Sequence, residues 1–220
     1  MRRFLYENSL SLAMLGLFLL FLAGQSLAGW YVYNSDQQDH QQPPIPYRAY
    51  LLSGHFYEAV FENWESEFLQ MSAYVIFTVY LRQKGSPESR PLDSTDTHED
   101  SVAAARRRAR SPWAARQYGW IRKIYEYSLT LALFLLFIFS FFLHAVAGQR
   151  TFNEEQALHG GHAVTLGGYI MASQFWFESF QNWQSEFLSV LSIVFLSIYL
   201  RQHGSPESKP VDAPNMETGG

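Results

Sequence analysis

The sequence predicts an all-α polytopic membrane protein, with four transmembrane helices arranged as two tandem helical hairpins that carry interfacial outer helices. Two long stretches without a charged residue predict the first helix of each hairpin. A repeat of the whole unit predicts the tandem arrangement. The distribution of Lys and Arg between the apolar stretches predicts which ends face the cytoplasm.

The repeat covers most of the chain. When residues 2–93 are laid over 121–212 without a gap, 35 of the 92 positions are identical, each 119 positions after its counterpart. We therefore expect two-span repeats at 1–93 and 121–212, joined by a flexible cytoplasmic linker at 94–120 and followed by a disordered tail at 213–220. Since each repeat has an even number of spans, an axis along the membrane normal should relate the two copies.

The first span of each repeat is the clearest apolar stretch. Residues 9–28 and 128–147 each run for 20 residues without a charge, enough to cross a hydrocarbon core of roughly 30 Å. A signal peptide is the competing interpretation of the first stretch, because Ser26-Leu27-Ala28 imitates a cleavage site. The equivalent residues 145–147 lie deep in the chain, where no such site would be used, so the repeat favours a retained span.

The second span of each repeat is less clear. Its apolar block, at 68–81 and again at 187–200, has only 14 residues, so a complete span must include the polar motif that precedes it. The aromatic-rich segments before these blocks are expected to form interfacial helices that bend into the span, with Gly54 as a hinge in the first copy.

The positive charges predict the orientation. Of the 16 Lys and Arg residues, all but Arg48 and Arg150 lie before the first span, between the second and third, or after the fourth. The positive-inside rule then places both termini and the linker in the cytoplasm. Four linker arginines are also candidates to bind anionic lipid, although fixing the topology is the preferred role: Arg106, Arg107, Arg108 and Arg110.

The strongest candidate site is a polar motif, Asn-Trp-x-Ser-Glu, at the start of each second span. On a helix its Asn, Trp and Glu share one face. A carboxylate about 7 Å inside the membrane boundary would be functional by default, whereas a hydrated carboxylate in the headgroup region is the alternative. The motif comprises Asn63, Trp64, Ser66 and Glu67, and Asn182, Trp183, Ser185 and Glu186.

The neighbours of the motif give two further predictions. Glu62 and Glu65 become Gln in the second copy, which predicts that their charge is dispensable. Gln25 and His144 stand at the outer ends of the first and third spans, and we expect them to pair with the Glu of the motif in their own copy.

Two groups at the inner ends of the spans have a structural interpretation. The first is a set of charges suited to helix ends, acidic at the start and basic at the finish: Glu7, Arg82, Glu126 and Arg201. The second is a helix-exit motif, in which glycine should form a left-handed C-cap and proline should stop the helix: Gly85, Pro87, Gly204 and Pro206.

Several chemistries are excluded or unsupported. Because the chain has no cysteine, it has no disulfide, thiolate nucleophile, iron–sulfur cluster or Cys-based zinc site. His159-Gly-Gly-His162 is a weak metal pattern, and no spacing of His, Asp and Glu completes a tetrahedral set. With no phosphate loop, nucleophile elbow or dinucleotide fingerprint either, we expect no catalytic residue, metal, cofactor or nucleic-acid partner.

Three segments resemble a known family. They are Arg-Phe-Leu-x-Glu-Asn-Ser-Leu-Ser-Leu at 3–12, Gly-Gln-Ser-Leu-Ala-Gly at 24–29, and the most specific, FENWESEFLQ at 61–70. Over 2–212 the chain is similar to uncharacterised bacterial integral membrane proteins grouped as domain of unknown function 6766. The resemblance implies a bacterial inner-membrane location and implies no activity.

The sequence thus favours a non-enzymatic membrane component, structural or regulatory, that lies in the lipid bilayer and assembles with itself or with a membrane-protein partner. The alternative is a small-solute or ion pathway lined by Asn63, Glu67, Asn182 and Glu186. An enzyme ranks third, because no group of residues fits the roles that catalysis needs.

Overall fold

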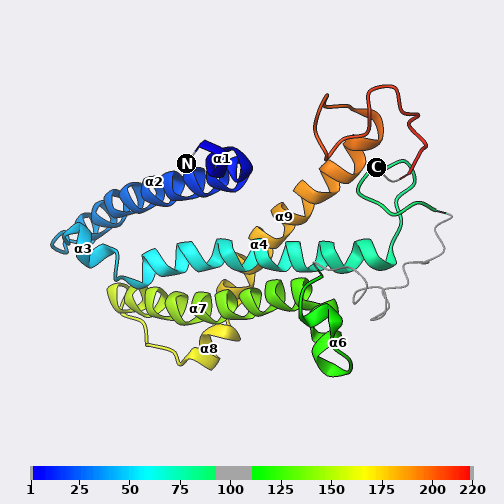
Figure 1. The fold of residues 1–220 in the computed structure, drawn as a ribbon. Helices are drawn as coiled ribbons and strands as arrows, with labels where there is room; N and C mark the ends of the chain where they lie inside the picture. The colour runs from blue at the N-terminus through cyan, green and yellow to red at the C-terminus, as the bar shows by residue number, and fades with distance from the viewer. Residues whose placement is uncertain (1, 93–110, 219–220) are drawn as a thin grey trace. The chain divides into compact units, whose positions relative to one another are not determined.

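The computed structural model describes residues 2–92 and 111–218, which form helices and connecting segments with no strand among them (Figure 1). Most of the helical residues belong to four long helices: α2 (Ser9–Asp39), α4 (Gly54–Tyr80), α7 (Ser128–Leu158) and α9 (Ser173–Tyr199). The shorter elements are α1 (Arg2–Glu7), α3 (Tyr47–Tyr50), the 3-10 helix η1 (Ala114–Arg116), α6 (Trp120–Glu126) and α8 (Leu166–Ile170). The all-helical prediction is confirmed for the described residues.

The long helices of the two halves have matching bounds. α2 and α7 are both 31 residues long, and α4 and α9 are both 27. Each long helix of the second half begins and ends 119 positions after its counterpart, which is also the offset between the identical residues of the sequence.

Two of the described helices, not four, are long and apolar enough to cross a membrane: α2 and α7. The prediction of four spans is therefore not supported by length and composition. The reason is local, because the 14-residue apolar blocks of α4 and α9 share their helix with the polar Asn-Trp-x-Ser-Glu segment.

Both long apolar helices extend well beyond their apolar stretch. α2 continues for 11 residues after residue 28, and its 31 residues span about 46 Å. Its end is a Schellman motif, in which the Gln42 N–H donates to the Gln37 carbonyl at 2.7 Å and Gln41 takes a left-handed φ of 60°. α7 ends in the same way, with the Gly161 N–H donating to the Gln156 carbonyl at 2.7 Å.

The segment after each of these ends differs from the expected interfacial helix. Pro43, Pro44 and Pro46 keep the first connection non-helical, and α3 follows with only four residues. The chain then breaks before Gly54, which starts α4 instead of forming a hinge inside a continuous helix. The second copy shows the same pattern, with the five-residue α8 ahead of α9.

The chain divides into two compact units, and each combines residues from both halves. The first unit contains Met1–Phe61 and Phe142–Phe175, and the second contains Glu62–Phe141 and Trp176–Gly220. Aromatic side chains form the centre of the first unit, where Tyr50, Tyr169 and Phe175 are buried. The second unit buries several polar groups, which include Glu65, Ser66 and Ser86. The division of the sequence into repeats, linker and tail stays a prediction.

Candidate functional site

The first unit contains a polar pocket of 580 Å³ at the C-terminal ends of α2 and α7. Its lining combines acidic, amide, hydroxyl and imidazole groups from these two helices and from the start of α4. The polar lining residues are Tyr33, Asp36, Gln37, Gln42, His55, Thr151, Glu154 and Glu155.

The histidine of the pocket is held by two tyrosines. The Tyr50 hydroxyl lies 3.3 Å from Nδ1 of His55, and the Tyr33 ring packs edge-on against the imidazole with centroids 5.5 Å apart. Burial lowers the pKa of His55, and the nearby negative charge of Asp36 opposes that shift. His55 is therefore mainly neutral near pH 7.

An acidic group of the pocket is also perturbed. Glu154 lies seven residues beyond the apolar stretch of α7, and burial raises the pKa of its carboxyl. The positive charge of Arg150 and a hydrogen bond from Tyr33 act in the opposite direction. Together with Asp36 and Glu155, this carboxyl makes the ends of α2 and α7 strongly acidic.

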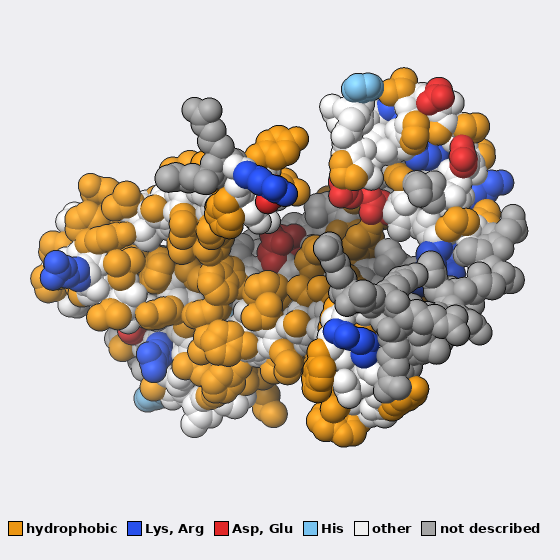
Figure 2. Space-filling model, in the orientation of Figure 1, with side chains coloured by type: hydrophobic (Ala, Val, Ile, Leu, Met, Phe, Trp, Pro, Cys, Tyr) orange, Lys and Arg blue, Asp and Glu red, His pale blue; other side chains and the backbone are white. Residues whose placement is uncertain are grey.

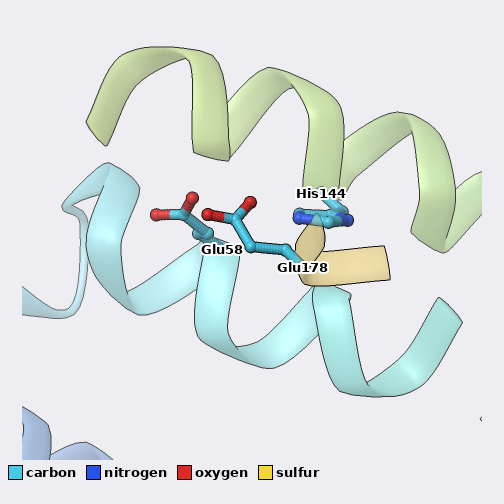
Figure 3. A group of neighbouring side chains, drawn as sticks. All are labelled: Glu58, His144 and Glu178. Carbon is cyan, nitrogen blue, oxygen red and sulfur yellow. The ribbon is translucent and has the colours of Figure 1, made fainter. Parts of the chain in front are cut away.

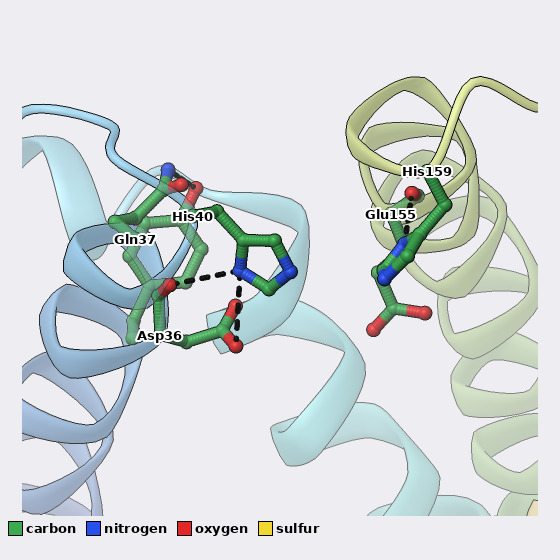
Figure 4. Close-up of polar contacts among 6 residues, drawn as sticks. Asp36, Gln37, His40, Glu155 and His159 are labelled. Carbon is green, nitrogen blue, oxygen red and sulfur yellow. Dashed lines mark hydrogen bonds and ion pairs between the residues drawn. The ribbon is translucent and has the colours of Figure 1, made fainter.

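Two histidines from these helix ends face each other (Figure 4). The rings of His40 and His159 are T-shaped, with centroids 5.3 Å apart and planes at 79°. Nδ1 of His40 lies 2.9 Å from the Asp36 carbonyl oxygen, and Nδ1 of His159 lies 2.9 Å from that of Glu155. We call these four residues, Asp36, His40, Glu155 and His159, the paired-histidine site.

The helix ends fix the positions of both histidines. His40 is the C-cap of α2, with its backbone N–H bonded to the Asp36 carbonyl, and the backbone N–H of His159 donates to the Glu155 carbonyl in the same way at the end of α7. The sequence spacing alone points to His159 with His162, three residues along the chain, as a weak metal pattern. The stronger signal was the repeat itself, because His40 and His159 are 119 positions apart and are the histidine that both copies share.

Next to this site, an asparagine in each copy holds the following loop. Asn34 donates from Nδ2 to the Ile45 carbonyl at 3.1 Å and accepts the Ile45 N–H at 2.8 Å. Asn153 makes the same two bonds to Val164, at 3.1 and 2.7 Å. We call each such pair of hydrogen bonds a loop clamp. One further donor reaches the same carbonyl in each copy, Trp30 in the first and Gln149 in the second.

In the second unit, the predicted polar motif contacts Glu62 and Glu65 of the first copy. The Asn182 amide donates to the Glu62 carboxylate, and the Trp183 Nε1–H donates to Glu65 Oε1 at 2.9 Å. Glu65 is fully buried. Glu62 and Glu65 are thus hydrogen-bond acceptors for the motif of the second copy. That their charge is dispensable stays a prediction, because a glutamine oxygen can accept the same bonds.

The other residues of the motif differ in exposure. Glu67 and Asn63 are exposed and Glu186 is half-buried, whereas Ser66 is buried and donates to the Asn63 carbonyl at 2.8 Å. The exposed Ser185 makes the equivalent bond to the Asn182 carbonyl, and Trp64 is half-buried. These serine bonds stay within one helix turn, so they leave the hydroxyls with a local structural role.

The two side chains expected to pair with the motif have different surroundings. Gln25 is exposed on α2, whereas His144 is fully buried on α7 and its ring packs against Phe175 with centroids 5.0 Å apart. Figure 3 shows His144 with Glu58 of α4, also in the first unit, and Glu178 of α9, in the second. Because Gln25 and His144 belong to the first unit and the motif to the second, the expected pairs stay predictions.

The charges at the inner helix ends have partners close by in sequence. Glu7 accepts a hydrogen bond from Arg3, and Glu126 accepts one from Arg122, both at 2.6 Å and four residues apart. The Arg82 guanidinium donates to the carbonyl of Val79 in the last turn of α4 and to that of Leu81 just after it, as expected for a basic residue at a helix C-terminus. Arg201 does the same at the end of α9, where its Nη1 donates to Ile198 and Leu200.

The chain matches one family over its whole length, residues 1–220, described as domain of unknown function (DUF6766). The chain belongs to the DUF6766 family. This confirms the resemblance seen in the sequence. No curated protein and no solved structure matches the DUF6766 chain, so its chemistry has to come from its own residues.

The exit motif of the DUF6766 chain is a turn beyond the helix, not a helix cap. Gly85 and Gly204 have φ of 84° and 79°, so both take the left-handed conformation. α4 has already ended at Tyr80, and Gly85 lies in a turn closed by the Ser86 N–H and the Gln83 carbonyl. Pro87 and Pro206 follow these turns and stop no helix themselves.

Ser89 and Ser208, which recur just after the exit motif, have a structural role in both copies. The Gln83 N–H donates to Ser89 Oγ, and the Gln202 N–H donates to Ser208 Oγ, both at 2.9 Å. In the first copy the Tyr74 hydroxyl also donates to the Glu88 carboxylate at 2.7 Å. The repeated motif of the DUF6766 chain is therefore a small hydrogen-bonded loop that forms in the same way twice.

A lysine fastens the last residues of the DUF6766 chain to the first of these loops. Lys209 is buried, and its Nζ lies within hydrogen-bond distance of four carbonyl oxygens, which share its three N–H groups: those of Gly85, Pro214, Asn215 and Glu217. All five residues belong to the second unit. These contacts join residues 214–217 to the loop that contains Gly85.

Proposed function

We propose that this protein is an integral membrane protein, held in the bilayer by α2 and α7, with a non-enzymatic structural or regulatory role. The supporting observation is the uncovered apolar surface of these helices. Only 6% of the apolar window of α2 and 22% of that of α7 is buried. Figure 2 shows hydrophobic side chains over much of the visible surface of α2. The core helix of a soluble protein would be mostly covered.

The energy of this surface favours a lipid environment. Each large apolar side chain that leaves water stabilises the protein by about 1.5–3 kcal/mol. α7 is also long, apolar and largely uncovered. It lies in the middle of the chain, where a signal sequence is not expected. The exposed large side chains in the apolar stretch of α2 are Leu10, Leu12, Met14, Leu15, Leu17, Phe18, Leu19, Leu20, Phe21 and Leu27.

We further propose that α4 and α9 enter the same membrane. Two observations support this proposal. The positive charges favour a cytoplasmic position for both termini and the linker, and that position requires the chain to return after α2 and again after α7. The polar groups Glu62, Glu65, Asn182 and Trp183 also bond to one another, which lowers the cost of removing them from water.

The same bonds favour a structural role over a solute or ion pathway. Two of the four proposed pathway residues belong to the second copy, and one of these, Asn182, is already bonded to Glu62. Trp183 is likewise bonded to the buried Glu65. A side chain committed to helix packing is less suited to bind a passing ion.

Membrane insertion and topology are tested first. We expect the protein to stay in the membrane fraction after alkaline carbonate extraction. Reporter fusions at Asp96 should be active on the cytoplasmic side, and fusions at His159 on the opposite side. A protein released by carbonate would contradict membrane insertion, and fusions at Asp96 and His159 on one side would contradict the crossing of α7. A fusion at His40 on the same side as the fusion at Asp96 would contradict the proposed crossing of α4.

The role is tested by reconstitution into liposomes. We expect no flux of small solutes or ions, and we expect crosslinking in membranes to capture the protein with itself or with a membrane-protein partner. Flux that is present in the wild type and lost in the Glu67→Gln/Glu186→Gln double variant would favour the pathway and contradict the non-transport role.

A further inference from the structure

We propose that the paired-histidine site binds a divalent transition-metal ion of the Zn²⁺ type, held by Nε2 of His40 and of His159 and completed by water oxygens. All four residues of the site lie in the first unit. The proposal goes beyond the membrane role and does not depend on it. It also revises the expectation of no metal, which rested on sequence spacing alone.

The hydrogen bonds select the ring nitrogen that can bind a metal. In each histidine, Nδ1 lies 2.9 Å from a backbone carbonyl oxygen, of Asp36 for His40 and of Glu155 for His159. A carbonyl oxygen only accepts, so Nδ1 must carry the proton. In the neutral ring the lone pair is then on Nε2, and a backbone carbonyl bonded to the other nitrogen is a common second shell for metal-bound histidine.

The spacing of the rings fits shared coordination. Two Nε2 atoms at about 2.0–2.1 Å from one metal in a tetrahedral arrangement would separate the two ring centroids by about 5.2 Å. The observed centroid separation is 5.3 Å. Figure 4 shows the two rings facing each other across the gap between the helix ends, with Asp36 and Glu155 close to it.

The charges around the rings favour a cation. Asp36 and Glu155 lie one helical turn before His40 and His159, so their side chains share a face with the histidines. Both rings also stand at helix C-termini, where the helix dipole is negative. Two imidazoles with water oxygens suit zinc, cobalt, nickel or copper ions, whereas magnesium and calcium prefer sites made of oxygen alone.

A simpler interpretation is that the two rings only pack against each other. The variants His40→Phe and His159→Phe separate the two explanations, because phenylalanine keeps the ring contact and removes the nitrogen ligand. His162→Phe is the matched control, since His162 is exposed and lies three residues after His159. The full chain is purified in detergent without a polyhistidine tag.

Isothermal titration with ZnCl₂ should give one ion per chain, and Co²⁺ should give the visible absorption of a tetrahedral complex. We expect each of His40→Phe and His159→Phe to weaken zinc binding at least 10-fold and to remove the cobalt band, and His162→Phe to change neither. Unchanged binding in the double variant, or an equal loss in His162→Phe, would overturn the proposal.

X-ray absorption of the zinc-loaded wild type provides a test that needs no variant. Two imidazoles in the first coordination shell are expected. A shell without imidazole would contradict the proposal even if the phenylalanine variants failed to fold.

Discussion

The loop clamps of the first unit and the Asn-Trp-x-Ser-Glu motif of the second unit use repeated residues in opposite ways. In the first unit, each copy closes its own loop clamp, with Asn34 bonded to Ile45 and Asn153 bonded to Val164. In the second unit, the motif of the second copy bonds to acceptors in the first, with Trp183 donating to Glu65. Contacts within a copy are thus present twice, whereas this contact between copies has a donor on one side and an acceptor on the other.

This difference explains which positions kept their identity. Each copy makes its own clamp, so each copy needs an asparagine at this position. Asn34 and its counterpart Asn153 are both asparagine. A contact between copies allows the equivalent positions to diverge, and Glu65 corresponds to Gln184. Divergence at a repeated position is therefore a poor reason to dismiss it, since one copy can use a residue that the other has lost.

The largest expected effect is at the contact between copies. Trp183→Phe removes the indole N–H and leaves the fully buried Glu65 without this donor, so we expect the free energy of unfolding to fall by about 2–3 kcal/mol. The measurement is unfolding of the detergent-solubilised protein by SDS, followed by circular dichroism.

The matched control is Trp64→Phe in the first copy. The residue equivalent to Glu65 is there Gln184, which is exposed and available to water. We expect a loss below about 1 kcal/mol. Equal losses in both variants would remove the distinction between the copies.

The loop clamps should give smaller and equal effects. Asn34→Ala and Asn153→Ala each delete two hydrogen bonds to one loop residue, so we expect each to lower stability by about 1–2 kcal/mol. Hydrogen exchange should accelerate at the amide of Ile45 in the first variant and of Val164 in the second. Exchange that accelerates in both loops after one change would contradict a clamp confined to its own copy.

A stabilising change is expected at the end of α2. Gln41 has a left-handed φ of 60°, and the equivalent residue in the second copy is Gly160 with φ of 72°. Because glycine adopts this conformation without a steric penalty, Gln41→Gly should raise stability by about 0.5–1 kcal/mol. In the reverse experiment, Gly160→Gln should lower the melting temperature. A destabilised Gln41→Gly would show that its side chain has a role of its own.

The smallest effect concerns pH. Burial lowers the pKa of His55, so the unfolded chain takes up a proton near pH 6.5, where the folded chain does not. The stability contributed by neutral His55 is therefore present above about pH 6.5 and is lost as the pH falls below it. The variant His55→Gln, which copies Gln174 of the second repeat, should show a shallower fall of the melting temperature between pH 7 and 5. Identical slopes would contradict this assignment.

The sequence was sufficient for the helical class and for the apolar helices, because uncharged stretches such as 9–28 depend on no distant partner. It did not predict that α2 continues to Asp39, because residues 29–39 change from aromatic to polar without a helical period, and the helix ends through backbone bonds. It also missed the contact of His40 with His159. That contact depends on how two helix ends converge, which no local spacing encodes.

The carbonyl cage around Lys209 makes this lysine a reporter of the tail. The chain has three lysines, and Lys84 and Lys123 are exposed. An amine-reactive acylating reagent should therefore modify those two first and leave Lys209 intact while residues 214–217 surround its ammonium group. Mass spectrometry would show the order in which the three lysine side chains are labelled. Early labelling of Lys209 would report that the C-terminal segment has detached, without a fluorophore or a fusion.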